Sequence, residues 1–165
     1  MAGEHVQAVH ELQELEEIRR LKARYCRFLD TKDVESWRAV FTTDVVVTLD
    51  MAVSVGGADP KTAPPLQGIN KFVPMVMGGL ENVATKHPEI QRSHTPELAL
   101  VSATTATGIW AMEDLARPRF SSLWDRKLFG AGHYHETYEK RAGSWRIKSL
   151  HLTRTMLKMS GGDDT

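Results

Sequence analysis

ELQELEEIRRLKARYCRFLD, residues 11–30, is the stretch that decides the fold of this chain. Apolar side chains recur in it at every third or fourth position: Leu12, Leu15, Ile18, Leu21, Tyr25, Phe28 and Leu29. Charged residues fill most of the positions between them. A stripe with this period lies along one side of an α-helix, so the stretch predicts an amphipathic helix with one face on a core.

Shorter elements follow this helix. Thr31-Lys-Asp33 interrupts the pattern, and the Asp33 side chain is suited to cap a second, short helix. The apolar side of that helix carries Val34, Trp37, Val40 and Phe41. Residues 45–49 predict a strand, because valine favours strands. A third helix is expected over residues 68–80, which makes the first half of the chain mainly helical.

The second half of the chain has the composition of strands. Residues 94–102, 104–114, 130–142 and 145–157 are rich in Thr, Val, Ile, Trp and Tyr. Arg141-Ala-Gly-Ser144 is typical of a hairpin turn between the last two. Helices followed by a meander of strands predict an α+β fold, with the helices on one face of an antiparallel sheet. Residues 51–66 and 115–129 are interpreted as loops, which either connect elements or shape the mouth of a pocket.

The length of 165 residues fits one domain. We expect an N-terminal extension at residues 1–10, a single domain at residues 11–157 and a flexible tail at residues 158–165. The start of the chain has no signal-peptide pattern, and no run approaches the ~18 apolar residues of a membrane span. The sequence therefore predicts a cytoplasmic protein.

Composition excludes several classes of function. Lys plus Arg equals Asp plus Glu, at 21 each, so no overall field favours nucleic acid or an anionic membrane. Cys26 is the one cysteine, which rules out an intrachain disulfide. No dinucleotide-binding, P-loop, serine-hydrolase or zincin motif occurs. We therefore expect no cofactor.

A series of short motifs runs along most of the chain. Its members are Ile18-x-x-Leu21-x-x-x-Tyr25-x-x-x-x-Asp30, Trp37…Phe41-Thr-x-Asp44, Ser93-His94, Ala106-x-Gly-x-Trp110-x-Met-x-Asp114, Gly132-x-Tyr134-x-x-x-Tyr138 and Gly143-x-Trp145-Arg-Ile147. In this order they resemble the SnoaL-like branch of the nuclear transport factor two-like superfamily, over roughly residues 11–157. The resemblance implies a cone-shaped curled sheet with about three N-terminal helices enclosing a pocket.

The resemblance also implies chemistry, although a shared fold alone does not. Members of the superfamily include scytalone dehydratase, bile-acid 7α-dehydratase, lindane dehydrochlorinase, steroid isomerases and polyketide cyclases, and others have no known catalysis. In the dehydratase and dehydrochlorinase members, an Asp on the first helix orients a His that removes a proton. Asp30 and His94 match these positions. Tyr25 matches an assisting tyrosine, and Arg154 matches a pocket arginine on the last strand.

The residues themselves leave alternatives open. Asp30 ends an apolar helical face, where a carboxylate needs a partner, but it also suits a cap or a surface position. His94 is either a general base or a hydrogen-bonded strand histidine. Tyr25 is either a donor to substrate or a core aromatic. Arg154 shares a strand face with Leu152, and that face is either the pocket or the outside.

The leading hypothesis is a dehydratase-like lyase. It would abstract a proton from a small hydrophobic oxygenated substrate of steroid, polyketide or aromatic type, with His94 as base and Asp30 as its orienter. An isomerase with the same pair, or a non-catalytic domain for ligand binding or assembly, is the alternative.

Two further expectations concern metals and partners. His133 and His135 share a strand face, with Glu139 and His151 nearby, but no recognised motif joins them and we expect no metal. The expected ligand is a small hydrophobic molecule. One face of a curled sheet needs covering, so a homo-oligomer, dimer or trimer, is expected.

Overall fold

Three helices and six strands make up the part of the chain that the computed structural model describes, residues 2–80, 90–116 and 127–160. In chain order they are α1 (Ala2–Asp30), α2 (Val34–Arg38), β1 (Phe41–Leu49), β2 (Leu66–Gln67), α3 (Ile69–Leu80), β3 (Ile90–Leu100), β4 (Thr105–Ala116), β5 (Lys127–Arg141) and β6 (Ser144–Ser160). The predicted α+β class is confirmed. Most of the predicted 115–129 loop, and the end of the predicted tail, lie outside the described residues.

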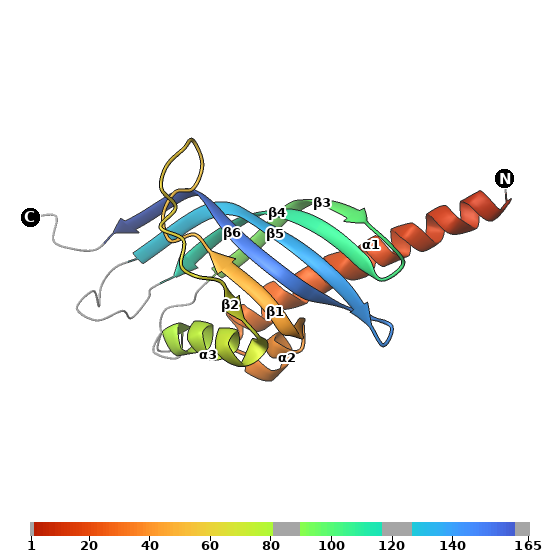
Figure 1. Cartoon of the computed structure of the whole chain (residues 1–165), viewed down its shortest axis with the longest axis horizontal. Helices are drawn as coiled ribbons and strands as arrows, with labels where there is room; N and C mark the ends of the chain where they lie inside the picture. The colour runs from red at the N-terminus through yellow and green to blue at the C-terminus, as the bar shows by residue number, and fades with distance from the viewer. Residues whose placement is uncertain (1, 81–89, 117–126, 161–165) are drawn as a thin grey trace, which may run out of the picture.

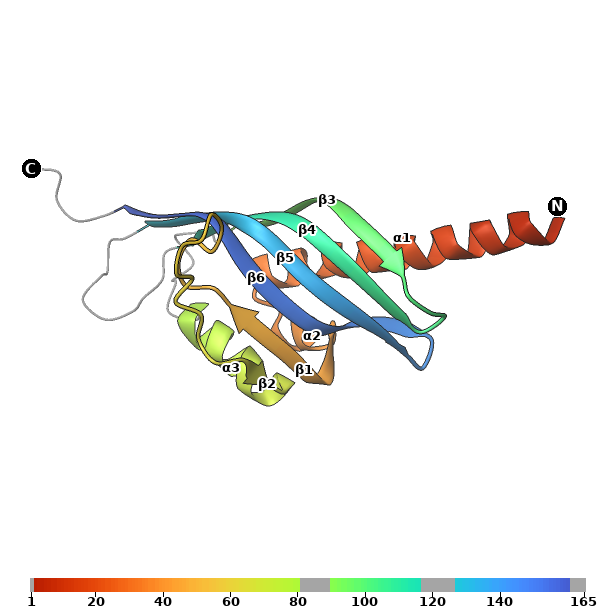
Figure 2. The same cartoon turned by 45° about the horizontal axis from the view of Figure 1, so that its top comes forward.

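The six strands form one curled sheet in the order β2-β1-β6-β5-β4-β3. Figures 1 and 2 show α1 running beneath one face of the long strands, with α2 and α3 beside β1. The expected antiparallel pairing holds from β3 to β6, but β1 pairs parallel with β6, from Phe41 opposite Ile147 to Leu49 opposite Leu152. The sheet is therefore mixed, and the expected antiparallel arrangement does not extend to the β1–β6 pair. Both β1 and β6 start at the end of the sheet where the β5–β6 hairpin lies, so they run in the same direction.

Helix α1 starts earlier than the apolar pattern indicated. The predicted helix over residues 11–30 is confirmed, and residues 2–10 continue it beyond the sheet (Figure 1). Its second half packs on the core through Ile18, Leu21 and Leu29, all at most 4% exposed. Where the two halves meet, the Glu14 carboxylate accepts hydrogen bonds from the Lys140 ammonium at 2.7 Å and from the Trp145 indole at 2.6 Å. These contacts tie α1 to the β5–β6 hairpin.

The predicted hairpin between β5 and β6 is confirmed. Its turn residues Ala142 and Gly143 both have positive φ, 48° and 78°. Two successive residues with positive φ give the mirror-image turn whose twist matches that of the flanking strands.

The loop before β2 is anchored to β6. The Ser54 hydroxyl accepts a hydrogen bond from the Arg154 backbone N–H at 2.7 Å. The buried Asp50 carboxylate accepts one from Thr62 at 2.8 Å and lies 3.0 Å from the His151 imidazole. These bonds fix the loop against the last strand.

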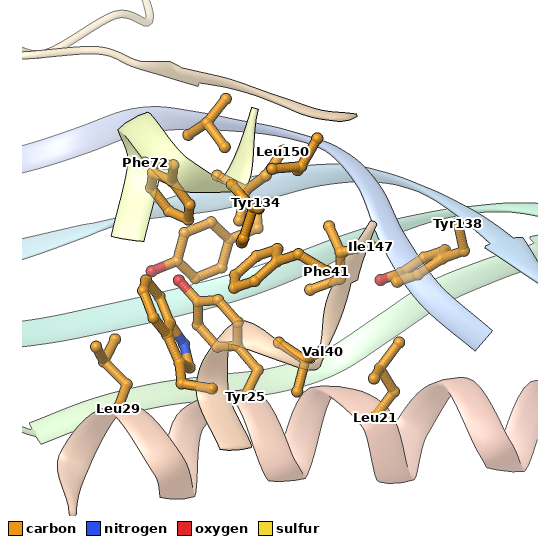
Figure 3. Packing of buried hydrophobic residues seen from close by; sticks show 14 of the residues in the cluster. Leu21, Tyr25, Leu29, Val40, Phe41, Phe72, Tyr134, Tyr138, Ile147 and Leu150 are labelled. Atoms are coloured by element: carbon orange, nitrogen blue, oxygen red, sulfur yellow. The ribbon is translucent and has the colours of Figure 1, made fainter. Parts of the chain in front are cut away.

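An aromatic cluster fills the space between the helices and the sheet. Its members are Tyr25, Trp37, Phe41, Phe72 and Tyr134, with ring centroids 5.0–5.9 Å apart (Figure 3). Four of the six pairs are edge-to-face, an arrangement that aromatic rings prefer, and the other two are tilted. The cluster brings Tyr25 of α1 and Tyr134 of β5 together, and so begins the site described next.

Candidate functional site

Asp30, the last residue of α1, is held by strand β3. One of its carboxylate oxygens, Oδ1, accepts a hydrogen bond from the Gln91 backbone N–H at 2.9 Å. Partial burial raises the pKa of the Asp30 carboxyl, although the Gln91 N–H and the charges of Lys32 and Arg92 act in the opposite direction. Asp30 is therefore a fixed carboxylate with increased basicity.

His94 does not meet Asp30. Its side chain is 46% exposed and lies 3.4 Å from the Glu113 carboxylate, while no hydrogen bond or ion pair joins it to Asp30 in the described part of the chain. The structure therefore does not bring the predicted Asp30–His94 pair together. The inner face of β3 near Asp30 instead carries Gln91 and Ser93. The Ser93 Oγ lies 3.5 Å from the Cys26 Sγ of α1.

A β-bulge explains the position of His94. In the pairing with β4, Ser93 lies opposite Met112, His94 opposite Ala111 and Pro96 opposite Trp110, which leaves Thr95 unpaired. Counting back in twos from Pro96 would turn His94 inward. The extra residue shifts the alternation, so Ser93 takes the inner face and His94 the outer one.

A chain of hydrogen bonds leads from the aromatic cluster to Asp30. The hydroxyls of Tyr25 and Tyr134 share a hydrogen bond, and Figure 3 shows them pointing toward each other. The Tyr134 hydroxyl also donates to the Gln91 side-chain oxygen at 2.9 Å, and the Gln91 backbone binds Asp30. Burial raises the pKa of both tyrosines, so both stay protonated at neutral pH. Although Tyr25 and Asp30 point in different directions from α1, this chain connects them.

Arg154 lies on the inner face, buried beside Leu152. Its Nη1 and Nη2 donate to the two carboxylate oxygens of Asp114 at 2.8 and 3.0 Å. The fork passes over Gly130, where an added Cβ would lie 1.9 Å from Arg154 Nη1 and 2.1 Å from Asp114 Oδ1. A side chain on that strand position would therefore break the ion pair.

A second buried ion pair, Lys22–Glu136, packs against the rings of Tyr25 and Tyr134. The Lys22 ammonium lies 2.5 Å from Glu136 Oε1, and both side chains are at most 1% exposed. The same ammonium lies 4.1 and 3.8 Å from the ring centroids of Tyr25 and Tyr134. Glu136 also accepts a hydrogen bond from the Tyr138 hydroxyl. This set of contacts holds both rings in place.

The sequence interpretation missed several of these groups. Lys22 had a readable signal, because it falls within the apolar stripe of the first helix, where a charge needs a partner. Tyr134 and Asp114 stood inside the quoted motifs but received no role. Gln91 had no signal, since its inward direction depends on the bulge at Thr95.

The histidine-rich face of the sheet lies on the outside. The ring centroids of His133 and His135 are 6.3 Å apart, and those of His135 and His151 are 6.2 Å apart. His135 and His151 help to line a surface hollow of about 600 Å³. Burial lowers the pKa of His135, with further lowering from the two neighbouring histidines. No group of three or more potential ligand side chains suited to a metal ion is found in residues 2–80, 90–116 and 127–160.

The chain matches a known family of domains. The sequence model of the SnoaL-like domain matches residues 10–151. In the described part of the chain, no helix is long and apolar enough to cross a membrane.

Similar solved structures include the LinA-type3 hexachlorocyclohexane dehydrochlorinase from Novosphingobium barchaimii (TM-score 0.70, 18% identity, covering 94% of this chain and 96% of that one). A scytalone dehydratase-like protein from Novosphingobium aromaticivorans has a TM-score of 0.69 and 19% identity, with 92% and 91% covered. Rv3472 from Mycobacterium tuberculosis, of unknown function, has a TM-score of 0.64 and 21% identity, with 89% and 75% covered. At these identities the likeness shows a shared fold.

Proposed function

Since the chain belongs to the SnoaL-like domain family, we propose that it converts a small, hydrophobic, oxygenated molecule by proton transfer, without a cofactor. Steroids, polyketides and aromatic compounds are the substrate types in question. The observation that carries the proposal is the hydrogen-bonded chain that leads from Tyr25 through Tyr134 and Gln91 to Asp30. It links two buried neutral donors to a basic carboxylate that is exposed at the end of α1.

Asp30 is the proposed base. One of its oxygens is fixed by the Gln91 N–H, and no hydrogen bond to the other is found in the described residues. A carboxylate with a raised pKa is a stronger base than an ordinary one. It would take a proton from the carbon beside a substrate carbonyl, and the electron pair would move onto the carbonyl oxygen.

Tyr134 and Tyr25 are the proposed donors to that oxygen. Because burial keeps both phenols protonated, each can supply a hydrogen bond to a developing enolate. Tyr134 now donates to the Gln91 side chain, and a substrate oxygen would take the place of that amide oxygen.

In a lyase, the enolate would collapse and expel a hydroxyl or halide from the adjacent carbon. In an isomerase, protonated Asp30 would return the proton to another carbon. Isomerisation is the second candidate, because Asp30 has a glutamine rather than a histidine beside it. A carboxylate working alone as base is the arrangement of ketosteroid isomerase, a known example of such chemistry.

The proposal assigns no proton transfer to His94, because its side chain faces the outer surface and Glu113. Asp30→Asn and His94→Ala therefore form a matched pair of variants. With cyclic ketones and β-hydroxy ketones in deuterated water, the wild type should incorporate deuterium beside the carbonyl. Asp30→Asn should lower this rate by at least about 100-fold, while His94→Ala leaves it unchanged.

Mass spectrometry of the substrate separates the possible results. Deuterium without loss of water indicates an isomerase, and loss of water indicates a lyase. A ketone that binds without any exchange would reject the catalytic proposal and favour a ligand-binding domain. An exchange rate in Asp30→Asn equal to that of the wild type, with circular dichroism unchanged, would reject Asp30 as the base.

A further inference from the structure

The charges buried in the interior are balanced in pairs. In the described residues, the buried cations are Lys22 and Arg154, and each faces a buried carboxylate, Glu136 or Asp114. The Arg154–Asp114 pair is the one near the proposed base, because Gln91 lies opposite Asp114 in the sheet and also binds Asp30. A ligand that reaches Asp30 therefore meets a guanidinium whose charge is already neutralised.

One donor of Arg154 is nevertheless left over. Nη1 and Nη2 are engaged by Asp114, while Nε is buried and has no hydrogen-bond partner in the part of the chain described. Buried donors nearly always have an acceptor, so an orphan of this kind calls for one from outside the protein. The residue is 8% exposed, which makes the donor part of the interior rather than of the surface.

We infer that the Arg154–Asp114 pair makes the interior selective for uncharged ligands, with Arg154 Nε donating a hydrogen bond to a neutral ligand oxygen. The inference rests on the proposed function and narrows its substrate class. A ketone, ether or hydroxyl oxygen accepts such a bond without bringing a charge. The ligand is thus a hydrophobic molecule with a neutral oxygen, not a carboxylate, sulfate or phosphate.

The electrostatics oppose an anionic ligand in two ways. A ligand carboxylate near Arg154 would place a second negative charge beside Asp114, and the Asp30 carboxylate lies at the same end of the sheet. It would also lose its hydration in an apolar interior without gaining an unpaired cation. Arg154 would bind an anion well only if Asp114 were removed.

The test uses pairs of probes with the same carbon skeleton. They are cyclohexanone with cyclohexanecarboxylate, α-tetralone with the tetralin carboxylate, and androstenedione with an androstene carboxylate. Calorimetry on the wild type should show at least about tenfold tighter binding of the ketone in the skeleton that fits. The Arg154 Nε–H signal in a proton–nitrogen NMR spectrum, assigned by its loss in Arg154→Lys, should shift when that ketone is added.

Asp114→Asn keeps the shape of the side chain and removes its charge. Arg154 then carries an uncompensated charge, so the affinity for the carboxylate probe should rise by at least about tenfold. The control is Asp44→Asn, which removes an exposed carboxylate that pairs with Lys148 and Arg141 and should change neither affinity. If Asp114→Asn fails to fold, the comparison of ketone and carboxylate binding by the wild type and the shift of the Nε–H signal still test the inference.

Each result bears on the inference. Wild-type binding of carboxylates as tightly as ketones would overturn it, while leaving a ligand-binding interior in place. An unchanged carboxylate affinity in folded Asp114→Asn, or no shift of the Nε–H signal with a bound ketone, would also overturn it. If no ketone of any size binds, the proposed function fails together with the inference.

Discussion

Raising the pH above about 10 should destabilise this protein through its tyrosines. The chain has three, Tyr25, Tyr134 and Tyr138, and all are at most 4% exposed. Burial raises the pKa of each hydroxyl above its usual value, and for Tyr138 the adjacent Glu136 carboxylate adds to the effect. The folded state thus holds these three protons more tightly than the unfolded state. The stability they contribute is complete below the unfolded pKa and is lost as the pH rises above it.

The size of the effect follows from linkage. One pH unit above its pKa of about 10, an unfolded tyrosine has lost about 90% of its proton. Each proton released on unfolding lowers the free energy of unfolding by about 1.4 kcal/mol per pH unit. Three tyrosines therefore remove about 4 kcal/mol per unit near pH 11, a large share of the roughly 5–15 kcal/mol of a typical domain.

The measurement is a series of urea unfolding curves between about pH 8 and 11, followed by circular dichroism. The near-ultraviolet absorbance of tyrosinate is recorded on the same samples. Because no tyrosine lies outside the interior, that absorbance should appear only together with unfolding. Tyr138→Phe keeps the ring and should reduce the pH slope by about one third.

A different result would refute the reasoning. If tyrosinate absorbance rises smoothly around pH 10 while the circular dichroism stays native, the hydroxyls titrate in the folded protein. A Tyr138→Phe slope equal to that of the wild type would show that this tyrosine does not contribute.

Two more predictions concern stability in urea. Lys22→Met should lower the free energy of unfolding by about 3–5 kcal/mol, because it leaves the Glu136 carboxylate buried without its cation. Adding Glu136→Gln should recover part of that loss. A loss below about 1 kcal/mol would mean that the ion pair is not formed. Gly130→Ala should cost about 1–3 kcal/mol by displacing the ion pair that crosses it, whereas Gly78→Ala, with nothing within 4 Å of its added Cβ, should be neutral or slightly stabilising. Equal effects at the two glycines would contradict the close approach.

Local patterns predicted most of the elements. The helical period over residues 11–30 and the hairpin signal at residues 141–144 both appear in the structure. Both depend on neighbours in sequence, which the chain displays directly. The parallel pairing of β1 with β6 was missed, because it joins segments about one hundred residues apart and depends on where the last hairpin ends.

The site was harder to predict for a related reason. Tyr25 and Arg154 lie on the inner side, as their spacing with apolar neighbours indicates, and their roles stay predictions. The resemblance to the family placed His94 inside, and counting back in twos from Pro96 would have given the same direction. A single unpaired residue, Thr95, reverses that count, and a bulge has no dependable signature in one sequence. The inward direction of Ser93 and Gln91 therefore could not be predicted from the sequence.

The parallel pairing of β1 with β6 has a consequence for how the chain is made. Phe41, Val45 and Val47 leave the ribosome about one hundred residues before their sheet partner, β6. The same holds for Glu14, whose partners Lys140 and Trp145 stand in the final hairpin. Strand β1 thus waits about one hundred residues before it gains its main neighbour in the sheet, whereas α1 meets its main partner, β3, earlier. The sheet therefore cannot be completed stepwise from the N-terminus during translation, and β1 is a strand that chaperones would meet before β6 covers its edge.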